Sequence, residues 1–169
     1  DKIKLMDMEK IKELIDKDAL NNFREKSMSN KNYNTRGTAQ NDDIYFQNTE
    51  VRNKYYEDAT EIVVDYMNKV NEVTGSNFKP FNYYGDKSAD SIITAMGSVC
   101  DTIRETVDYL NSQGHKYGMV EVHLYRPFSN KYLLDVIPSS VKKIAVLDRT
   151  KEPAANGEPL YLDVVSALK

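Results

Sequence analysis

The most regular pattern of apolar and polar positions lies in residues 52–74. Its apolar side chains recur at the i, i+3, i+4, i+7 spacing of one helix face. They are Ala59, Ile62, Val63, Tyr66, Met67, Val70 and Val73. Gly75 follows, and glycine readily takes the left-handed conformation that ends a helix. The spacing therefore predicts an amphipathic helix that packs on a hydrophobic core through this stripe.

Residues 1–29 contain two shorter helical patterns. Ile11, Leu14 and Ile15 recur at helical spacing in the first. Ala19, Leu20 and Phe23 do so in the second, and Asp18 is placed to cap that helix. We therefore expect the N-terminal part of the chain to be mainly helical.

From residue 88 the pattern alternates between strand and helix. Apolar or alternating runs predict strands at residues 90–95, 119–125 and 143–147. Helices are predicted after the Gly97-Ser98 turn, where Cys100, Ile103, Val107 and Leu110 mark the buried face, and at residues 129–136 and 157–168. Strands separated by helices imply parallel pairing with right-handed crossovers.

These elements predict one domain with an α/β fold. We assign residues 85–169 to an open, mainly parallel, three-layer α/β core. Residues 1–84 are expected to form a helical and extended N-terminal part that packs on this core.

Composition narrows the class of protein. The chain has 169 residues, of which 40% are hydrophobic and 29% charged, with a net charge of -3. This balance favours neither nucleic acid nor an anionic membrane as a partner. The mean hydropathy of -0.62 suggests that some segments lie on other parts of a larger protein. The single cysteine, Cys100, excludes an internal disulfide and a cysteine-only metal or iron–sulfur site, and we expect a cytoplasmic protein.

Residues 36–47 have no helical period and end in an apolar cluster. A polar ribbon with an apolar anchor is typical of a segment that packs on a neighbouring surface, although an ordinary surface loop has the same pattern. The residues of this predicted interdomain ribbon are Arg36, Gly37, Thr38, Gln40, Asn41, Tyr45 and Phe46.

The loops that follow the predicted strands are the candidate ligand site, because open α/β sheets bind ligands beyond the carboxyl ends of their strands. Ser98 and Asp101 match a capping box, and the backbone N–H groups after Gly97 are also suited to an anion. Arg126 and Arg149 suit an anion as a clamp. The alternative, which we favour, is that they form ion pairs with Asp148, Glu152 or a partner domain.

The sequence offers few other candidates for catalytic or ligand-binding residues. The sequence lacks the glycine-rich nucleotide motifs, so no nucleotide site is expected. His115 is expected in a solvated turn, and His123 on a strand facing a helix or solvent. Cys100 falls on an apolar helix face and is expected in the core. We therefore assign no catalytic residue and no metal ligand.

Five blocks of sequence, in order, resemble pyruvate:ferredoxin (flavodoxin) oxidoreductases. The first, RGTAQN-x-DIYFQ at residues 36–47, is similar to the opening of the second domain of that family. The second, at residues 95–111, is similar to its first strand, turn and helix. The others lie at residues 124–129, 145–153 and 157–164.

The resemblance implies a domain like the C-terminal domain of transketolases, within a large cytoplasmic homodimer. Such an enzyme converts pyruvate and coenzyme A to acetyl-CoA and carbon dioxide, and reduces ferredoxin. It uses thiamine diphosphate and iron–sulfur clusters. The domain would contact the other domains of the oxidoreductase and its dimer mate.

This sequence also departs from the family. It lacks the thiamine diphosphate Gly-Asp-Gly motif and the cysteines of a cluster, so we expect no bound cofactor and no activity for this chain alone. The family sheet continues beyond residue 169, and we expect truncation at the C-terminal edge. Two other functions stay open: a module that binds an anion such as coenzyme A phosphate or a substrate carboxylate, and a regulator that dimerises through a free sheet edge.

Overall fold

A four-stranded sheet forms the centre of the computed structural model, which describes residues 5–33 and 39–169. The strands are β1 (Phe81–Gly85), β2 (Ser91–Met96), β3 (Tyr117–Val122) and β4 (Lys143–Val146), in the spatial order β1-β3-β2-β4. β2 is parallel to both β3 and β4, whereas β1 is antiparallel to β3. The predicted open, mainly parallel α/β fold is confirmed.

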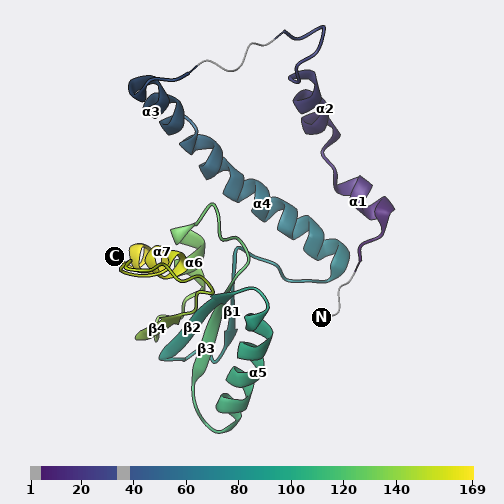
Figure 1. Cartoon of the computed structure of the whole chain (residues 1–169). Coiled ribbons are helices and arrows are strands. Elements are labelled where there is room, and N and C mark those ends of the chain that lie inside the picture. The colour runs from purple at the N-terminus through teal and green to yellow at the C-terminus, as the bar shows by residue number, and fades with distance from the viewer. Residues whose placement is uncertain (1–4, 34–38) are drawn as a thin grey trace.

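Helices cover both faces of the sheet (Figure 1). α5 (Val99–Ser112) packs on one face; α6 (Asn130–Val136) and α7 (Pro159–Ala167) pack on the other. Successive residues of a strand point to opposite faces. Ile92 therefore lies in the core beneath α6 and α7, while Ala95 lies beneath α5 with Cys100. The expectation that Cys100 lies in the core is confirmed.

β1 is a strand that the hydrophobic pattern did not predict. It crosses the boundary that we placed between residues 84 and 85, so the sheet begins at Phe81 and not in residues 85–169 alone. Phe81 is fully buried, but the rest of the strand, Asn-Tyr-Tyr-Gly, lacks a clear alternation of apolar and polar residues. Its pairing with β3 was invisible without the tertiary structure.

Within the described part of the chain, four helices precede the sheet: α1 (Met8–Leu14), α2 (Lys17–Glu25), α3 (Asp42–Glu50) and α4 (Asn53–Thr74). α4 ends at Gly75, whose φ is +68°, as the sequence predicted. α3 begins inside the ribbon at residues 36–47, which was expected to be non-helical, so that expectation is wrong for residues 42–47. Its pattern was missed because its apolar residues are consecutive and spread around the helix axis.

The helices before the sheet differ in how far they are buried. α1, α2 and α3 have no buried residue, and Figure 1 shows α1 and α2 away from the sheet. In α4 only Thr60 is buried, and Ile62 of the apolar stripe is 58% exposed. Most of the stripe (Ala59, Val63, Tyr66, Met67 and Val70) is half-buried, and Glu61 of α4 accepts a hydrogen bond from the Tyr132 hydroxyl of α6 at 3.0 Å, so this face is partly covered. Periodicity reports amphipathicity, but not whether a partner surface exists within the chain.

Two predicted helix caps are also corrected. α2 is capped by Asp16, whose Oδ1 accepts a hydrogen bond from the N–H of Ala19 at 2.9 Å, and Asp18 lies in the first turn instead. Ser98 precedes α5 with a helical backbone, and its side chain makes no capping hydrogen bond. The Ser98–Asp101 pair is therefore not a capping box.

Candidate functional site

The carboxyl ends of β2 and β4 border a hollow of about 680 Å³. Gly97, Ser98 and Thr102 line it from the turn into α5, and Asp148 and Arg149 line it from the loop after β4. Gly97 has a φ of +79°, a backbone conformation that suits glycine and lets the chain turn from strand to helix. Four of the five residues predicted at this edge thus lie around one hollow.

Arg126, the fifth, does not line this hollow. Its Nη1 lies 2.7 Å from Oδ2 of Asp163 in α7. The guanidinium also stacks over the ring of Tyr125, 4.0 Å from its centroid, and donates a hydrogen bond to the Tyr125 hydroxyl at 3.1 Å. The structure therefore favours an ion pair for Arg126, but with a carboxylate that sequence reasoning did not name.

Asp148 and Arg149 differ in their surroundings. An oxygen of Asp148 accepts a hydrogen bond from the N–H of Tyr161 at 3.1 Å, which ties the loop after β4 to the first turn of α7. Arg149 is exposed and has no ion-pair partner among the residues that the structure describes. Asp148 thus has a structural contact, while Arg149 is the cation available to the hollow.

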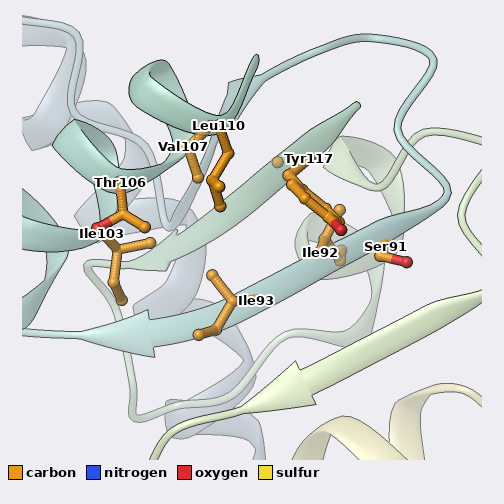
Figure 2. Close-up of a pocket in the computed structure, with 9 residues that line it drawn as sticks. Ser91, Ile92, Ile93, Ile103, Thr106, Val107, Leu110 and Tyr117 are labelled. Atoms are coloured by element: carbon orange, nitrogen blue, oxygen red, sulfur yellow. The ribbon is translucent and has the colours of Figure 1, made fainter. Parts of the chain in front are cut away.

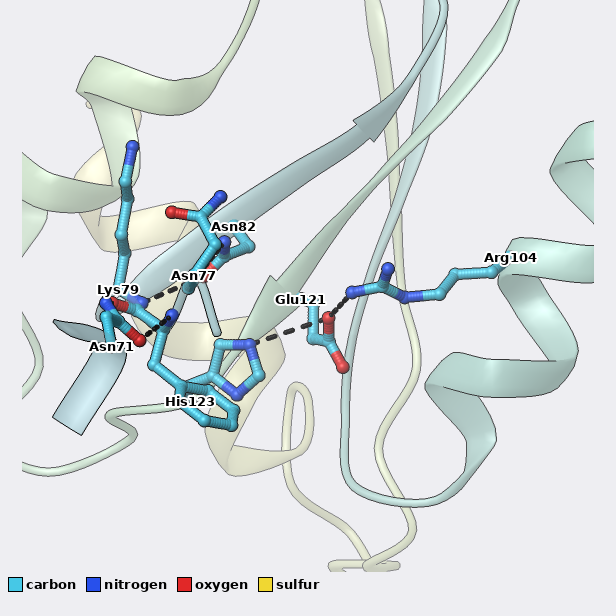
Figure 3. Close-up of polar contacts among 8 residues, drawn as sticks. Asn71, Asn77, Lys79, Asn82, Arg104, Glu121 and His123 are labelled. Carbon is cyan, nitrogen blue, oxygen red and sulfur yellow. Dashed lines mark hydrogen bonds and ion pairs between the residues drawn. The ribbon is translucent and has the colours of Figure 1, made fainter. Parts of the chain in front are cut away.

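A second polar cluster lies at the end of β3 (Figure 3). Glu121 has a side chain that is only 13% exposed, and it accepts a hydrogen bond from the Arg104 guanidinium of α5. His123 Nε2 lies 3.5 Å from the same carboxylate oxygen, and the His123 ring meets Phe78 edge-on. These residues border a cavity of about 340 Å³.

Electrostatics in this cluster point to a structural role. The hydrogen bond to Glu121 raises the pKa of Arg104. Burial, followed by the negative charge of Glu121, raises the pKa of the nearby Cys100 thiol to about 11. The thiol is therefore protonated at neutral pH and is not an activated nucleophile. The i, i+2 spacing of Glu121 and His123 on one strand was the available sequence signal, but nothing in the sequence pointed to Arg104.

Asparagine side chains fix the loop between α4 and β1 beside this cluster (Figure 3). Asn71 of α4 forms two hydrogen bonds with the backbone of Phe78, at 2.7 and 2.9 Å. Asn82 of β1 accepts from the N–H of Lys79 at 3.0 Å and donates to the carbonyl of Asn77 at 2.7 Å. These bonds hold the end of α4 against the start of the sheet.

An apolar cavity of about 270 Å³ lies between α5 and β2 (Figure 2). Ile93, Ile103 and Leu110 line it, and Tyr117 lies at one end. The lining offers almost no polar group, so it has nothing with which to orient a polar substrate. We interpret it as the space beside α5, above a part of the sheet that this helix does not cover.

The predicted interdomain ribbon is only partly within the described residues. Arg36, Gly37 and Thr38 lie outside them. Gln40 and Asn41 are exposed, and Asn41 directly precedes α3. Tyr45 and Phe46 lie on α3 and are 58% and 65% exposed. The apolar anchor of the ribbon thus faces solvent in this chain.

Residues 89–169 match the family model described as pyruvate:ferredoxin oxidoreductase core domain II. The pyruvate-flavodoxin oxidoreductase of Enterobacter agglomerans is 54% identical to this chain, over 98% of the chain and 14% of that protein. The pyruvate:ferredoxin oxidoreductase of Moorella thermoacetica is 47% identical, over 99% of the chain and 14% of that protein. The chain thus spans about one seventh of the length of these relatives.

Among solved structures, the chain is similar to a 2-oxoglutarate:ferredoxin oxidoreductase from Magnetococcus marinus. The match has a TM-score of 0.42 and 21% identity, and it covers 70% of this chain and 20% of that one.

Two features are absent from the residues that the structure describes. No helix among them is long and apolar enough to cross a membrane. Within residues 5–33 and 39–169, no group of three or more His, Cys, Asp or Glu side chains is placed to hold a metal ion.

Proposed function

We propose that this chain is a structural, domain-joining part of a cytoplasmic pyruvate:ferredoxin oxidoreductase. The parent enzyme would convert pyruvate and coenzyme A to acetyl-CoA and carbon dioxide, with reduction of ferredoxin. The observation that carries this proposal is the similarity to the Enterobacter agglomerans enzyme at 54% identity over nearly the whole chain. The match of residues 89–169 to the model described as pyruvate:ferredoxin oxidoreductase core domain II also supports it.

The exposed apolar surface supports a role in domain contacts. Large apolar side chains on α1 to α4 face solvent, among them Phe23, Phe46, Tyr55 and Ile62. Many exposed large apolar side chains on these helices are typical of surfaces that contact another part of a protein. The partners that fit are the other domains of the same oxidoreductase and its dimer mate.

The cofactors of the parent enzyme have no matching residues here. An iron–sulfur cluster held by cysteines needs four thiolates, whereas this chain has one cysteine and it is buried. The thiamine diphosphate Gly-Asp-Gly motif is absent from the sequence. We therefore propose that both cofactors are held elsewhere in the parent enzyme, and we assign this chain no catalytic residue.

A chimera tests the proposal. Replacing the matching 166-residue segment of the Enterobacter agglomerans enzyme with this chain should preserve dye reduction by pyruvate, coenzyme A and thiamine diphosphate. The purified chain alone should give no reduction under the same conditions. Turnover by the chain alone would contradict a purely structural role, and a folded but inactive chimera would contradict its place in this enzyme.

The hollow between β2 and β4 favours a second candidate function, the binding of an anionic group. Gly97, Ser98 and Arg149 line it, and a guanidinium suits a phosphate or carboxylate. Calorimetry with coenzyme A should then show binding that Arg149→Ala removes. Arg126→Ala is the matched control, because its guanidinium is engaged with Asp163 outside the hollow. No heat at millimolar coenzyme A would exclude this candidate.

A further inference from the structure

A hollow of about 470 Å³ lies between α4 and residues 127–130, which lead into α6. It shares no lining residue with the hollow at the carboxyl ends of β2 and β4 or with the cavity beside β3. Its lining on α4 comes from one face of the helix, because the residues are spaced by three and four positions. Apart from Tyr56, the lining side chains that carry oxygen are Asn53, Glu57, Thr60, Glu61, Ser129 and Asn130.

Two carboxylates on this face of α4 lack a counter-charge. Glu57 and Glu61 are one helical turn apart, and like charges at this spacing repel each other. Neither has an ion-pair partner within residues 5–33 and 39–169. Glu61 accepts a hydrogen bond from the Tyr132 hydroxyl at 3.0 Å, which orients its carboxylate but adds no positive charge. The pair is therefore suited to a cation.

Thr60 is a buried polar side chain that lines the same hollow. It is only 9% exposed, and a buried hydroxyl normally has a hydrogen-bond partner because losing water without replacement is unfavourable. The hydroxyl of Thr74 in the same helix donates to the carbonyl of Val70 at 2.8 Å. In the described part of the chain, the Thr60 hydroxyl has no such bond. It therefore offers a free oxygen to the hollow.

The remaining donors are neutral oxygens. Ser129 precedes α6 and makes no capping hydrogen bond through its side chain. The amide nitrogen of Asn53 donates to Glu50 at 3.1 Å, which leaves the amide oxygen able to accept. Carboxylate, carbonyl and water oxygens suit Mg²⁺, Ca²⁺ and Mn²⁺, whereas imidazole and thiolate suit zinc and copper. The hollow is also wide enough for the waters that Mg²⁺ keeps or that complete the shell of Ca²⁺.

We propose that this hollow binds one hard divalent cation, Mg²⁺ or Ca²⁺, between α4 and the start of α6. Glu57 and Glu61 supply the negative charge, Thr60 and Ser129 supply neutral oxygens, and water completes the coordination shell. Only two of these ligands are acidic, so the site is compatible with the lack of a three-residue His, Cys, Asp or Glu group in the described residues. Two carboxylates give a weak site, with a Kd of roughly 0.1–1 mM.

Terbium luminescence tests the location of the ion. Tb³⁺ binds oxygen ligands as Ca²⁺ does, and it emits when a nearby tyrosine absorbs the exciting light. The chain has no tryptophan, and Tyr56 lines the hollow. Emission excited through tyrosine should therefore appear with Tb³⁺ and be lost when excess Ca²⁺ is added. Tyr56→Phe should reduce this emission, whereas Tyr109→Phe, on the exposed side of α5, should not.

Calorimetry with CaCl₂ and MgCl₂ tests the ligands and shows which ion binds more tightly. Glu57→Gln and Glu61→Gln should each weaken binding roughly tenfold or more, because each removes one of the two charges. Glu72→Gln is the matched control, since it makes the same change at an exposed position near the other end of α4. Thr60→Val should also weaken binding and Thr60→Ser should retain it, while circular dichroism confirms that each variant is folded.

Two results would overturn the proposal. A folded chain that gives no heat with either ion at several millimolar has no such site. Binding that is unchanged in both Glu57→Gln and Glu61→Gln would place the ion elsewhere on the chain. Both measurements use the chain alone, so they do not depend on its place in an oxidoreductase.

Discussion

At the scale of single residues, burial in the core determines how much a side chain contributes to the free energy of unfolding. Leu133 and Leu134 are neighbours in α6, but Leu133 is fully buried between the sheet and α7 while Leu134 is 44% exposed. The two have identical chemistry and the same helix propensity. Only the direction of the side chain separates them.

Truncation of this pair gives a direct comparison. Leu133→Ala should lower the free energy of unfolding by about 2–5 kcal/mol, because it removes buried methyl groups and leaves a cavity. Leu134→Ala should change it by less than about 0.5 kcal/mol. Urea denaturation followed by circular dichroism measures both. Equal losses would mean that α6 does not pack as described.

The raised pKa of the Cys100 thiol makes the free energy of unfolding depend on pH. Its folded-state pKa is raised to about 11, chiefly by burial. A raised pKa means that the folded state holds its proton more tightly than the unfolded state. This stabilisation is present below the unfolded pKa and is lost as the pH rises through the folded value.

We therefore expect the free energy of unfolding to fall between about pH 9 and pH 11, since the ordinary thiol pKa is about 8.5. In Cys100→Ala this part of the fall should disappear. The thiol of the native chain should also react slowly with iodoacetamide at pH 8 and become fast in urea. Fast alkylation of the folded protein would contradict the burial of Cys100.

At the scale of elements, β1 depends on a close approach to β3. Gly85 at its end has a φ of +112°, and a Cβ there would lie 2.6 Å from the carbonyl oxygen of Tyr117 and 2.7 Å from Cα of Gly118. Both obstacles are backbone atoms that cannot rotate away. Gly75, at the end of α4, also has a positive φ, but open space surrounds it.

These two glycines form a matched pair for mutation. Gly85→Ala should lower the free energy of unfolding by more than about 3 kcal/mol. The new methyl group would clash with the backbone of β3, and backbone strain of about 1–3 kcal/mol is added to that clash. Gly75→Ala should cost about 1 kcal/mol, from the conformation alone. Thermal unfolding of both variants provides the measurement, and equal costs would contradict the tight pairing of β1 with β3.

At the scale of the whole molecule, the buried residues found within 5–33 and 39–169 all lie from α4 onward. No residue of α1, α2 or α3 is buried, whereas β2 and β3 contain Ile92, Ala95, Met119 and Val120 in the core. Local stability follows buried contacts. The chain should therefore respond to unfolding in two stages.

Hydrogen exchange tests this division. Amides in α1 to α3 should exchange within seconds to minutes, while those of β2 and β3 should persist to near the global free energy of unfolding. Limited trypsin digestion should remove residues before α4 first and leave a resistant fragment that contains residues 81–169. Protection of α1 or α2 equal to that of β3 would show that these helices pack on the core after all.

The sequence by itself determined those features that depend on local pattern. The alternation of strands and helices after residue 88, the end of α4 at Gly75 and the burial of Cys100 each follow from periodicity or from the conformational freedom of glycine. Four of the five residues at the sheet edge could also be placed together, because parallel strands bring their carboxyl ends to one side of a sheet. These features follow either from local sequence pattern or from the general geometry of a parallel sheet.

Only the tertiary structure decided the features that join distant residues. The pairing of β1 with β3, the ion pair of Arg126 with Asp163 and the contact of Arg104 with Glu121 link segments whose separation in sequence carries no periodic signal. The partial exposure of the α4 stripe, with Ile62 58% exposed, is of the same kind. An amphipathic pattern shows that a helix has an apolar face, but whether that face is covered depends on where the rest of the chain folds.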